Sequence, residues 1–159
     1  QRRGLLARQG PPRTLGAGAG HHAGDLLAPH IGERHRSRKG LQQVEHILAL
    51  LLNFAQRNRG MTRVLTGDAL VNENERLQAR INLLHDKIEA ALKQALRVAA
   101  TQQQISTEAD FGGLANLLLC FVVGRWQQYA KSGFSREPSA LWAQQWPMLL
   151  VACLSQRRG

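Results

Sequence analysis

The sequence has few of the residues that build large cores and reactive sites. Only 5% of its 159 residues are aromatic, cysteines number two, and 11 acidic residues face 21 lysines and arginines. Its longest strongly apolar run free of charge, residues 111–124, is shorter than the roughly 20 residues that cross a bilayer. These shortages exclude a transmembrane helix and a disulfide framework. The length favours a single domain.

Metal and catalytic patterns are also missing. Cys120 and Cys153 lie in apolar runs without metal spacing, so we interpret both as small buried hydrophobic residues of a reducing compartment. The four histidines within residues 21–35 lack the spacing and the partner ligands of a zinc site. His46 and His85 each adjoin a carboxylate, but adjacent helical residues point to different faces. We therefore expect no metal, no cofactor and no enzymatic activity.

Residues 1–40 differ in composition from the rest of the chain. They hold eight of the 21 lysines and arginines and two of the 11 acids, and so carry +6 of the formal +10 charge. They also hold 8 of the 15 glycines and none of the aromatic residues. So little apolar surface cannot offset the entropy of ordering the segment. We predict a disordered or irregular basic segment at 1–40 and a helical domain at 41–159.

From Leu41 onward, apolar residues recur at helical spacing. The pattern predicts a helix from Leu41 to a stop at Gly60, and then a short helical turn over residues 61–67. A long helix follows, capped by Asp68 and running to about Gln103. Its apolar stripe over residues 77–95 has a near-heptad spacing.

Two more apolar helices follow. The stretch TEAD at residues 107–110 has the form of a capping box and opens a helix that ends at Gly133. Pro138 suits the first turn of a last helix over residues 138–154, which Pro147 interrupts. This pair has more apolar surface than one chain covers, so we predict a homodimer through it. The expected interface residues are Leu118, Phe121, Val122, Trp126, Trp142, Trp146 and Leu149.

The stretch RNRGMTRVLTG at residues 57–67 carries the most specific signal. It resembles, residue by residue, the nucleoid occlusion branch of the TetR family, with Arg59 in place of a proline. A second stretch, GRWQQYAKSGFSREPSALWAQQWPML from Gly124 onward, is similar to the end of the same proteins. The resemblance covers about residues 40–151.

The resemblance implies an all-α TetR-type C-terminal domain that forms a homodimer. It also implies a cytoplasmic, nucleoid-associated, DNA-binding regulator that antagonises polymerisation of the tubulin-like division protein FtsZ. By position it assigns partner binding to Leu50, Asn53, Arg57 and Asn58, with Arg63 as a contact or a brace. Asn53 stands where the family has glycine. Arg57 suits this role because a guanidinium pairs well with the carboxylates of an acidic tail.

The helix-turn-helix unit that opens a TetR protein is not recognisable in residues 1–40, so DNA-contacting residues stay unassigned. The Arg, Gly, Pro and His bias of this segment is what a GC-rich gene gives when read in a shifted frame, which we state as a hypothesis. Translation of the upstream nucleotides in all three frames tests it, and the absence of a helix-turn-helix in every frame would refute it.

Two other functions stay open. A TetR-type ligand-responsive transcriptional repressor needs a cavity between its long helices, and the crowded Leu and Ile stripe argues against one. A structural helical dimer with a basic tail could instead bind nucleic acid nonspecifically through Arg34, Arg36, Arg38 and Lys39.

Overall fold

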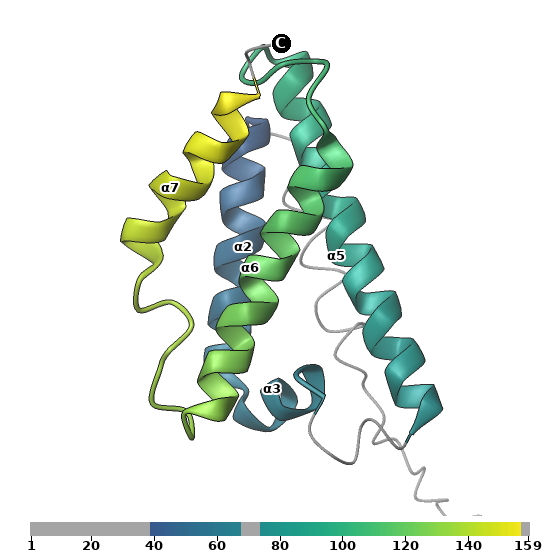
Figure 1. Ribbon diagram of the computed structural model, residues 1–159, viewed down its shortest axis with the longest axis vertical. Helices are drawn as coiled ribbons and strands as arrows, with labels where there is room; N and C mark the ends of the chain where they lie inside the picture. The colour runs from purple at the N-terminus through teal and green to yellow at the C-terminus, as the bar shows by residue number, and fades with distance from the viewer. Residues whose placement is uncertain (1–38, 68–73, 157–159) are drawn as a thin grey trace, which may run out of the picture.

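The computed structural model describes residues 39–67 and 74–156, and every regular element among them is a helix. These are α2 (Gly40–Arg57), α3 (Arg59–Leu65), α5 (Glu75–Thr101), α6 (Phe111–Lys131) and α7 (Trp142–Ser155). In Figure 1, α2 and α6 occupy the centre, α5 and α7 flank them, and α3 crosses at one end. The all-α expectation is confirmed. The expectations for residues 1–38 and for Asp68 fall outside the described residues.

The core forms where α2 packs against α5 and α6. The stripe expected on α2 is buried, with Val44, Leu48, Leu51, Leu52 and Ala55 fully inaccessible and Ile47 1% exposed. Each large apolar side chain buried in this way contributes about 1.5–3 kcal/mol. The long helix α5 supplies Leu84, Ile88, Leu92 and Ala95, all at most 4% exposed, as its stripe predicts.

The first turn of α2 touches the backbone of α5. A Cβ on Gly40 would lie 2.5 Å from the Cα of Ala99 and 2.6 Å from the carbonyl oxygen of Ala95. The N–H groups that open α2 have no capping side chain from Lys39. They donate instead to the side chains of Gln102, at 2.7 Å from Gly40, and Gln104, at 3.0 Å from Leu41. The polar loop after α5 thus caps α2.

The ends of α2 and α3 differ in part from the prediction. The expected stop at Gly60 is wrong, because α2 ends at Arg57 and Gly60 lies inside α3. The break falls at Asn58, whose side-chain amide donates to the carbonyl of Phe54 at 2.8 Å. Gly67, with φ +73°, ends α3 as expected.

The start of α5 and the cap of α6 also differ from the prediction, although α6 begins at Phe111 as expected. Helix α5 begins at Glu75, and its cap is Asn74, whose side chain accepts from the N–H of Leu77 at 3.1 Å. The prediction of a capping box at residues 107–110 is wrong, because Asp110 itself caps α6. Its side chain accepts a hydrogen bond from the N–H of Gly113 at 2.9 Å.

Helix α7 begins at Trp142, four residues later than expected. The reason is that Arg125 donates to the carbonyls of Glu137 at 2.9 Å and Pro138 at 3.2 Å, which would otherwise open the helix. Pro147 lies inside α7 as expected, and Gly133, with φ +62°, follows the end of α6.

The two cysteines have different environments. Cys153 is buried as expected, and burial raises the pKa of its thiol to about 11. Cys120 is exposed, so the expectation of burial is wrong for this residue, which lies on the outer side of α6. None of the helices in the described ranges is long and apolar enough to cross a membrane.

Gly40→Ala should lower the free energy of unfolding by at least about 1–3 kcal/mol, because the new methyl group overlaps the backbone of α5. The matched control is Gly60→Ala, where the new Cβ has nothing within 4 Å and should add up to about 1 kcal/mol through helix propensity. Urea unfolding followed by circular dichroism measures both. Equal effects of the two substitutions would contradict the close approach of α2 to α5.

Candidate functional site: the C-terminal end of α2

The residues assigned to partner binding lie at the end of α2 and on α3. Leu50, Asn53 and Arg57 are spaced three and four residues apart, so they share one face of α2. Leu50 is half-buried, whereas Asn53 and Arg57 are exposed. Asn58 stands at the break between the helices, and Arg63 is exposed on α3. The structure therefore places all five within two consecutive elements.

Arg57, Arg59 and Arg63 lack a counter-ion in the parts of the chain that the structure describes. No carboxylate in those parts forms an ion pair with any of the three. The neighbouring amides are already engaged, because Asn53 donates to the carbonyl of Ala49 at 2.9 Å and Asn58 to that of Phe54. The end of α2 and α3 thus carry three arginines that have no ion-pair partner among the described residues.

The last carbonyls of α2 accept hydrogen bonds mainly from side chains, and the backbone N–H of Asn58 also donates to the carbonyl of Ala55 at 3.1 Å. The carbonyl of Phe54 accepts from the Asn58 amide, as described above. The carbonyl of Ala55 lies 2.8 Å from the hydroxyl of Thr62, a residue of α3 with no exposed surface. The carbonyl of Gln56 accepts from the hydroxyl of Tyr129 on α6 at 2.9 Å.

The side chain of Gln56 joins the same end of α2 to the loop between α6 and α7. Its Oε1 accepts from the hydroxyl of Ser139 at 2.6 Å and from the N–H of Ser139 at 3.2 Å. Its Nε2 donates to the Glu137 carboxylate at 3.3 Å. Sequence reasoning missed Gln56 and Thr62 because their partners lie on other elements.

Arg125 fixes the same loop from inside. Besides the carbonyls of Glu137 and Pro138, its guanidinium donates to the side chain of Gln128 at 2.5 Å. Burial lowers the pKa of Arg125, and the charge of Arg136 lowers it further. An arginine nevertheless stays charged in proteins, so Arg125 acts as a permanent clamp on the loop.

Phe134, in the loop after α6, lies against two arginines of α3. Its φ is +66°, a conformation in which a bulky residue is an outlier. Its N–H donates to the carbonyl of Tyr129 at 2.9 Å, and its ring meets the Tyr129 ring edge-on with centroids 5.0 Å apart. The guanidinium carbons of Arg59 and Arg63 lie 5.5 Å and 5.3 Å from its centroid. An aromatic residue directly after a helix-ending glycine is the only sequence signal for this contact.

The residues assigned to the dimer interface fall into two groups. Leu118, Val122 and Trp126 are at most 1% exposed, and the Trp126 indole donates to the carbonyl of Leu51 at 3.1 Å. These three lie in the core of the single chain. The other four are Phe121, Trp142, Trp146 and Leu149, which are half-buried around α7. The Trp142 ring centroid lies 6.3 Å from that of Phe121 and 5.6 Å from that of Trp146.

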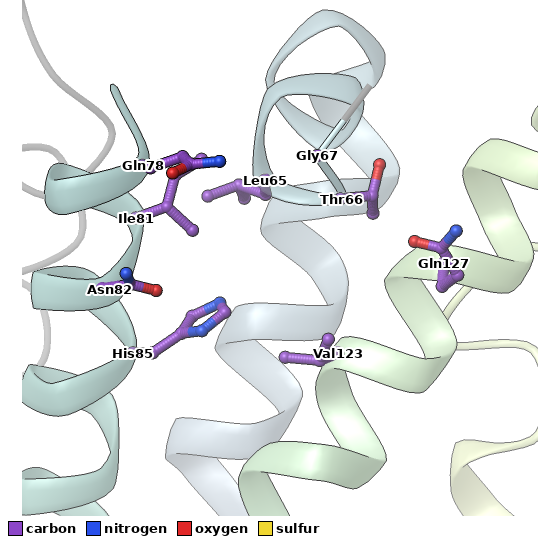
Figure 2. Close-up of a pocket in the computed structure, with 9 residues that line it drawn as sticks. All are labelled: Leu65, Thr66, Gly67, Gln78, Ile81, Asn82, His85, Val123 and Gln127. Atoms are coloured by element: carbon purple, nitrogen blue, oxygen red, sulfur yellow. The ribbon is translucent and has the colours of Figure 1, made fainter. Parts of the chain in front are cut away.

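A cavity of about 420 Å³ lies between α3, α5 and α6 (Figure 2). His85 of α5 lines it together with Thr66, Asn82 and Gln127, and its Nε2 is buried without a hydrogen-bond partner among the described residues. Burial lowers the pKa of His85, and the nearby charges of Asp86 and Glu89 partly offset this lowering. This end of α5 thus borders a pocket that is open to solvent, which the apolar stripe does not predict.

Comparison with known proteins gives a consistent result. Residues 38–154 match the family described as tetracyclin repressor-like, C-terminal domain, in its SlmA-like form. The chain is 40% identical over 126 residues to nucleoid occlusion factor SlmA of Colwellia psychrerythraea, which is 79% of this chain and 60% of that protein. It is 45% identical over 106 residues to the protein of the same name from Shewanella amazonensis, which is 67% of this chain and 54% of that protein.

The chain thus spans 54–60% of the length of these relatives. The family match covers α2 to the last turn of α7, including the break at Asn58 and the loop that carries Phe134. The resemblance found in the sequence is confirmed, and the chain belongs to the SlmA-like C-terminal domain family of the tetracycline repressor-like proteins.

Proposed function

We propose that this chain is the dimerisation and partner-binding part of an SlmA-like nucleoid occlusion factor. In this proposal it antagonises FtsZ polymerisation and septum assembly, in the cytoplasm, in association with the nucleoid. The names of the relatives support nucleoid occlusion. The observation that carries the proposal is Arg57, exposed on the braced end of α2 and without an ion-pair partner in the described parts of the chain. DNA association is implied by the family, through a part that is not recognisable in this chain.

The end of α2 has the groups needed to bind an acidic peptide. Arg57 can form two parallel hydrogen bonds to one carboxylate, and such charge-assisted bonds are about twice as strong as neutral ones. Leu50 offers apolar surface one to two turns away on the same face. Asn53 adds a side chain where the family has glycine, and this side chain narrows the approach of a peptide backbone.

The proposed homodimer uses the outer sides of α6 and α7. Leu117 on α6 is 50% exposed, and Met148 and Val151 on α7 are 70% and 63% exposed. Apolar groups gathered on adjacent helices are typical of an interface. The buried Leu118, Val122 and Trp126 then support the interface from beneath, whereas Phe121, Trp142, Trp146 and Leu149 border it.

The cavity at His85 favours a second candidate function, a ligand-responsive transcriptional repressor. Its size lies within the range of small-molecule sites, and its lining mixes Ile81 and Val123 with polar groups. A ligand bound there would raise the melting temperature by mass action, and a thermal-shift screen of metabolites tests this. Absence of any stabilising compound would favour the division regulator.

Arg57→Asp should abolish the effect of the chain on FtsZ, because an acid replaces the main carboxylate-binding group. The measurement is sedimentation of FtsZ polymers with GTP, in the presence of each variant. Arg97→Asp is the matched control. Arg97 is exposed on α5, so this substitution makes the same change in charge at a site away from the end of α2. Equal effects of Arg57→Asp and Arg97→Asp would refute the assigned role of Arg57.

Leu117→Glu combined with Met148→Glu should convert the dimer to a monomer, since two charges per chain would be buried in the interface. Size-exclusion chromatography with light scattering gives the mass. Leu83→Glu is the control, because Leu83 is 53% exposed on α5 and lies outside the proposed interface. A native chain that is monomeric at high concentration would rule out this interface.

The stability of the chain should fall as pH is lowered through 6.5. The folded-state pKa of His85 is below its unfolded value of 6.5, so the unfolded chain binds the proton more readily. Stability is then lost from about pH 6.5 down to the folded pKa. His85→Gln should flatten this part of a stability–pH curve from urea unfolding. An unchanged slope in His85→Gln would contradict the burial of this imidazole.

A further inference from the structure

Two arginines share one aromatic ring at the end of the bundle. The guanidinium carbons of Arg59 and Arg63 are 5.5 Å and 5.3 Å from the Phe134 centroid, within the range of cation–π attraction. The two residues are four apart on α3, so their side chains leave the helix on one face. The ring therefore gathers two like charges at one place, although neither has a carboxylate partner among the described residues.

The surroundings add positive charge to this cluster. Lys131 and Arg136 are exposed and lie three and two residues from Phe134, at the end of α6 and in the following loop. Glu137 is the acid of this loop, and its carboxylate already accepts from Gln56. An anion placed between Arg59 and Arg63 would relieve their mutual repulsion and would take charge-assisted hydrogen bonds from both.

The position of Phe134 is fixed at a cost in backbone strain. Its φ of +66° is disfavoured for a bulky side chain, yet the Arg125 clamp and the bond to Tyr129 hold it there. Because the ring is fixed, the guanidinium groups that stack on it lose less conformational freedom when they bind. Phe134 is therefore a positioning residue for the two arginines.

We propose that Arg59, Phe134 and Arg63 form an anion-binding subsite that continues the Arg57 surface and binds carboxylates of an acidic peptide containing apolar residues. Charge complementarity requires an anion. A peptide fits better than a nucleic acid, because the same end of α2 presents half-buried Leu50 and Phe54, and a phosphate backbone has no apolar groups to cover them. The role of the subsite in division control rests on the proposed function.

The subsite also distinguishes this chain from the family pattern. Arg59 stands where the resembling stretch has proline, which has no charge to offer. A chain with proline at this position would present Arg63 alone on the aromatic ring. Of two peptides that differ only in their number of acidic residues, the more acidic one should therefore gain more affinity from Arg59.

The direct test is fluorescence anisotropy of a labelled synthetic peptide of alternating aspartate and leucine residues, titrated with the whole chain. Arg59→Gln and Arg63→Gln should each weaken binding about tenfold, as expected for loss of a charge-assisted bond. Phe134→Leu should weaken it about threefold, and Phe134→Trp should restore it, because only the aromatic ring attracts the guanidinium groups. Arg97→Gln is the control for net charge.

The two substitutions at Phe134 distinguish a role in positioning the arginines from a role in packing. Leucine and tryptophan suffer the same backbone strain at this φ, so they differ mainly in the aromatic face. Melting temperatures by circular dichroism show whether each variant is folded. If Phe134→Leu unfolds the chain, the exposed Arg59→Gln and Arg63→Gln variants still decide the matter.

The proposal would be overturned if the Arg59→Gln and Arg63→Gln variants bound the peptide with the same affinity as the Arg97→Gln variant. It would also be overturned if the chain bound a mixed-sequence DNA duplex more tightly than the peptide and lost that binding on the same substitutions. That result would assign the cluster to nucleic acid. Failure of the proposed function is distinguishable, because it appears as an unchanged FtsZ effect in Arg57→Asp while the peptide result stands. Failure of the subsite alone leaves the Arg57→Asp result intact.

Discussion

The hydrogen bonds to the last carbonyls of α2 determine where the candidate binding groups lie. A helix that ends inside a protein leaves its final carbonyls without helical donors, and each one left unsatisfied is costly. Here the side chains of Asn58, Thr62 and Tyr129 donate to three consecutive carbonyls, and the N–H of Asn58 adds a second donor to that of Ala55. Because the donors come from the break, from α3 and from α6, the same bonds that end α2 also fix its neighbours.

The loop between α6 and α7 extends this framework. Arg125 holds its backbone from the α6 side, and Gln56 holds Ser139 and Glu137 from the α2 side. Phe134 is thereby fixed beneath the arginines of α3. A surface built in this way can keep several cations together, because among the described residues the framework, and not a carboxylate, holds them in place. This is the physical basis for reading the surface as a binding site.

Sequence reasoning succeeded where local patterns decide the structure. Periodicity alone identified the buried face of α2, and glycines at positive φ marked the ends of α3 and α6. It failed where a distant partner decides. Periodicity shows that Trp126 lies on an apolar face but not which neighbour covers it. The structure buries its side chain within its own chain, and its part in a dimer interface stays a prediction. The contact between Phe134 and Arg59 joins residues far apart in the chain, and the cavity at His85 depends on how α5 packs against α3 and α6. The cavity leaves no local signal, and the contact leaves only the aromatic residue that follows Gly133.

The central claim is that the end of α2, with α3, is the surface that meets an acidic partner. Backbone amide shifts of the isotopically labelled chain, followed by NMR during titration with FtsZ, test it most directly. The account predicts that the largest changes occur at Arg57, Asn58 and Arg63 and in the loop around Phe134. Changes confined to the outer sides of α6 and α7, or to the cavity lined by His85, would contradict it.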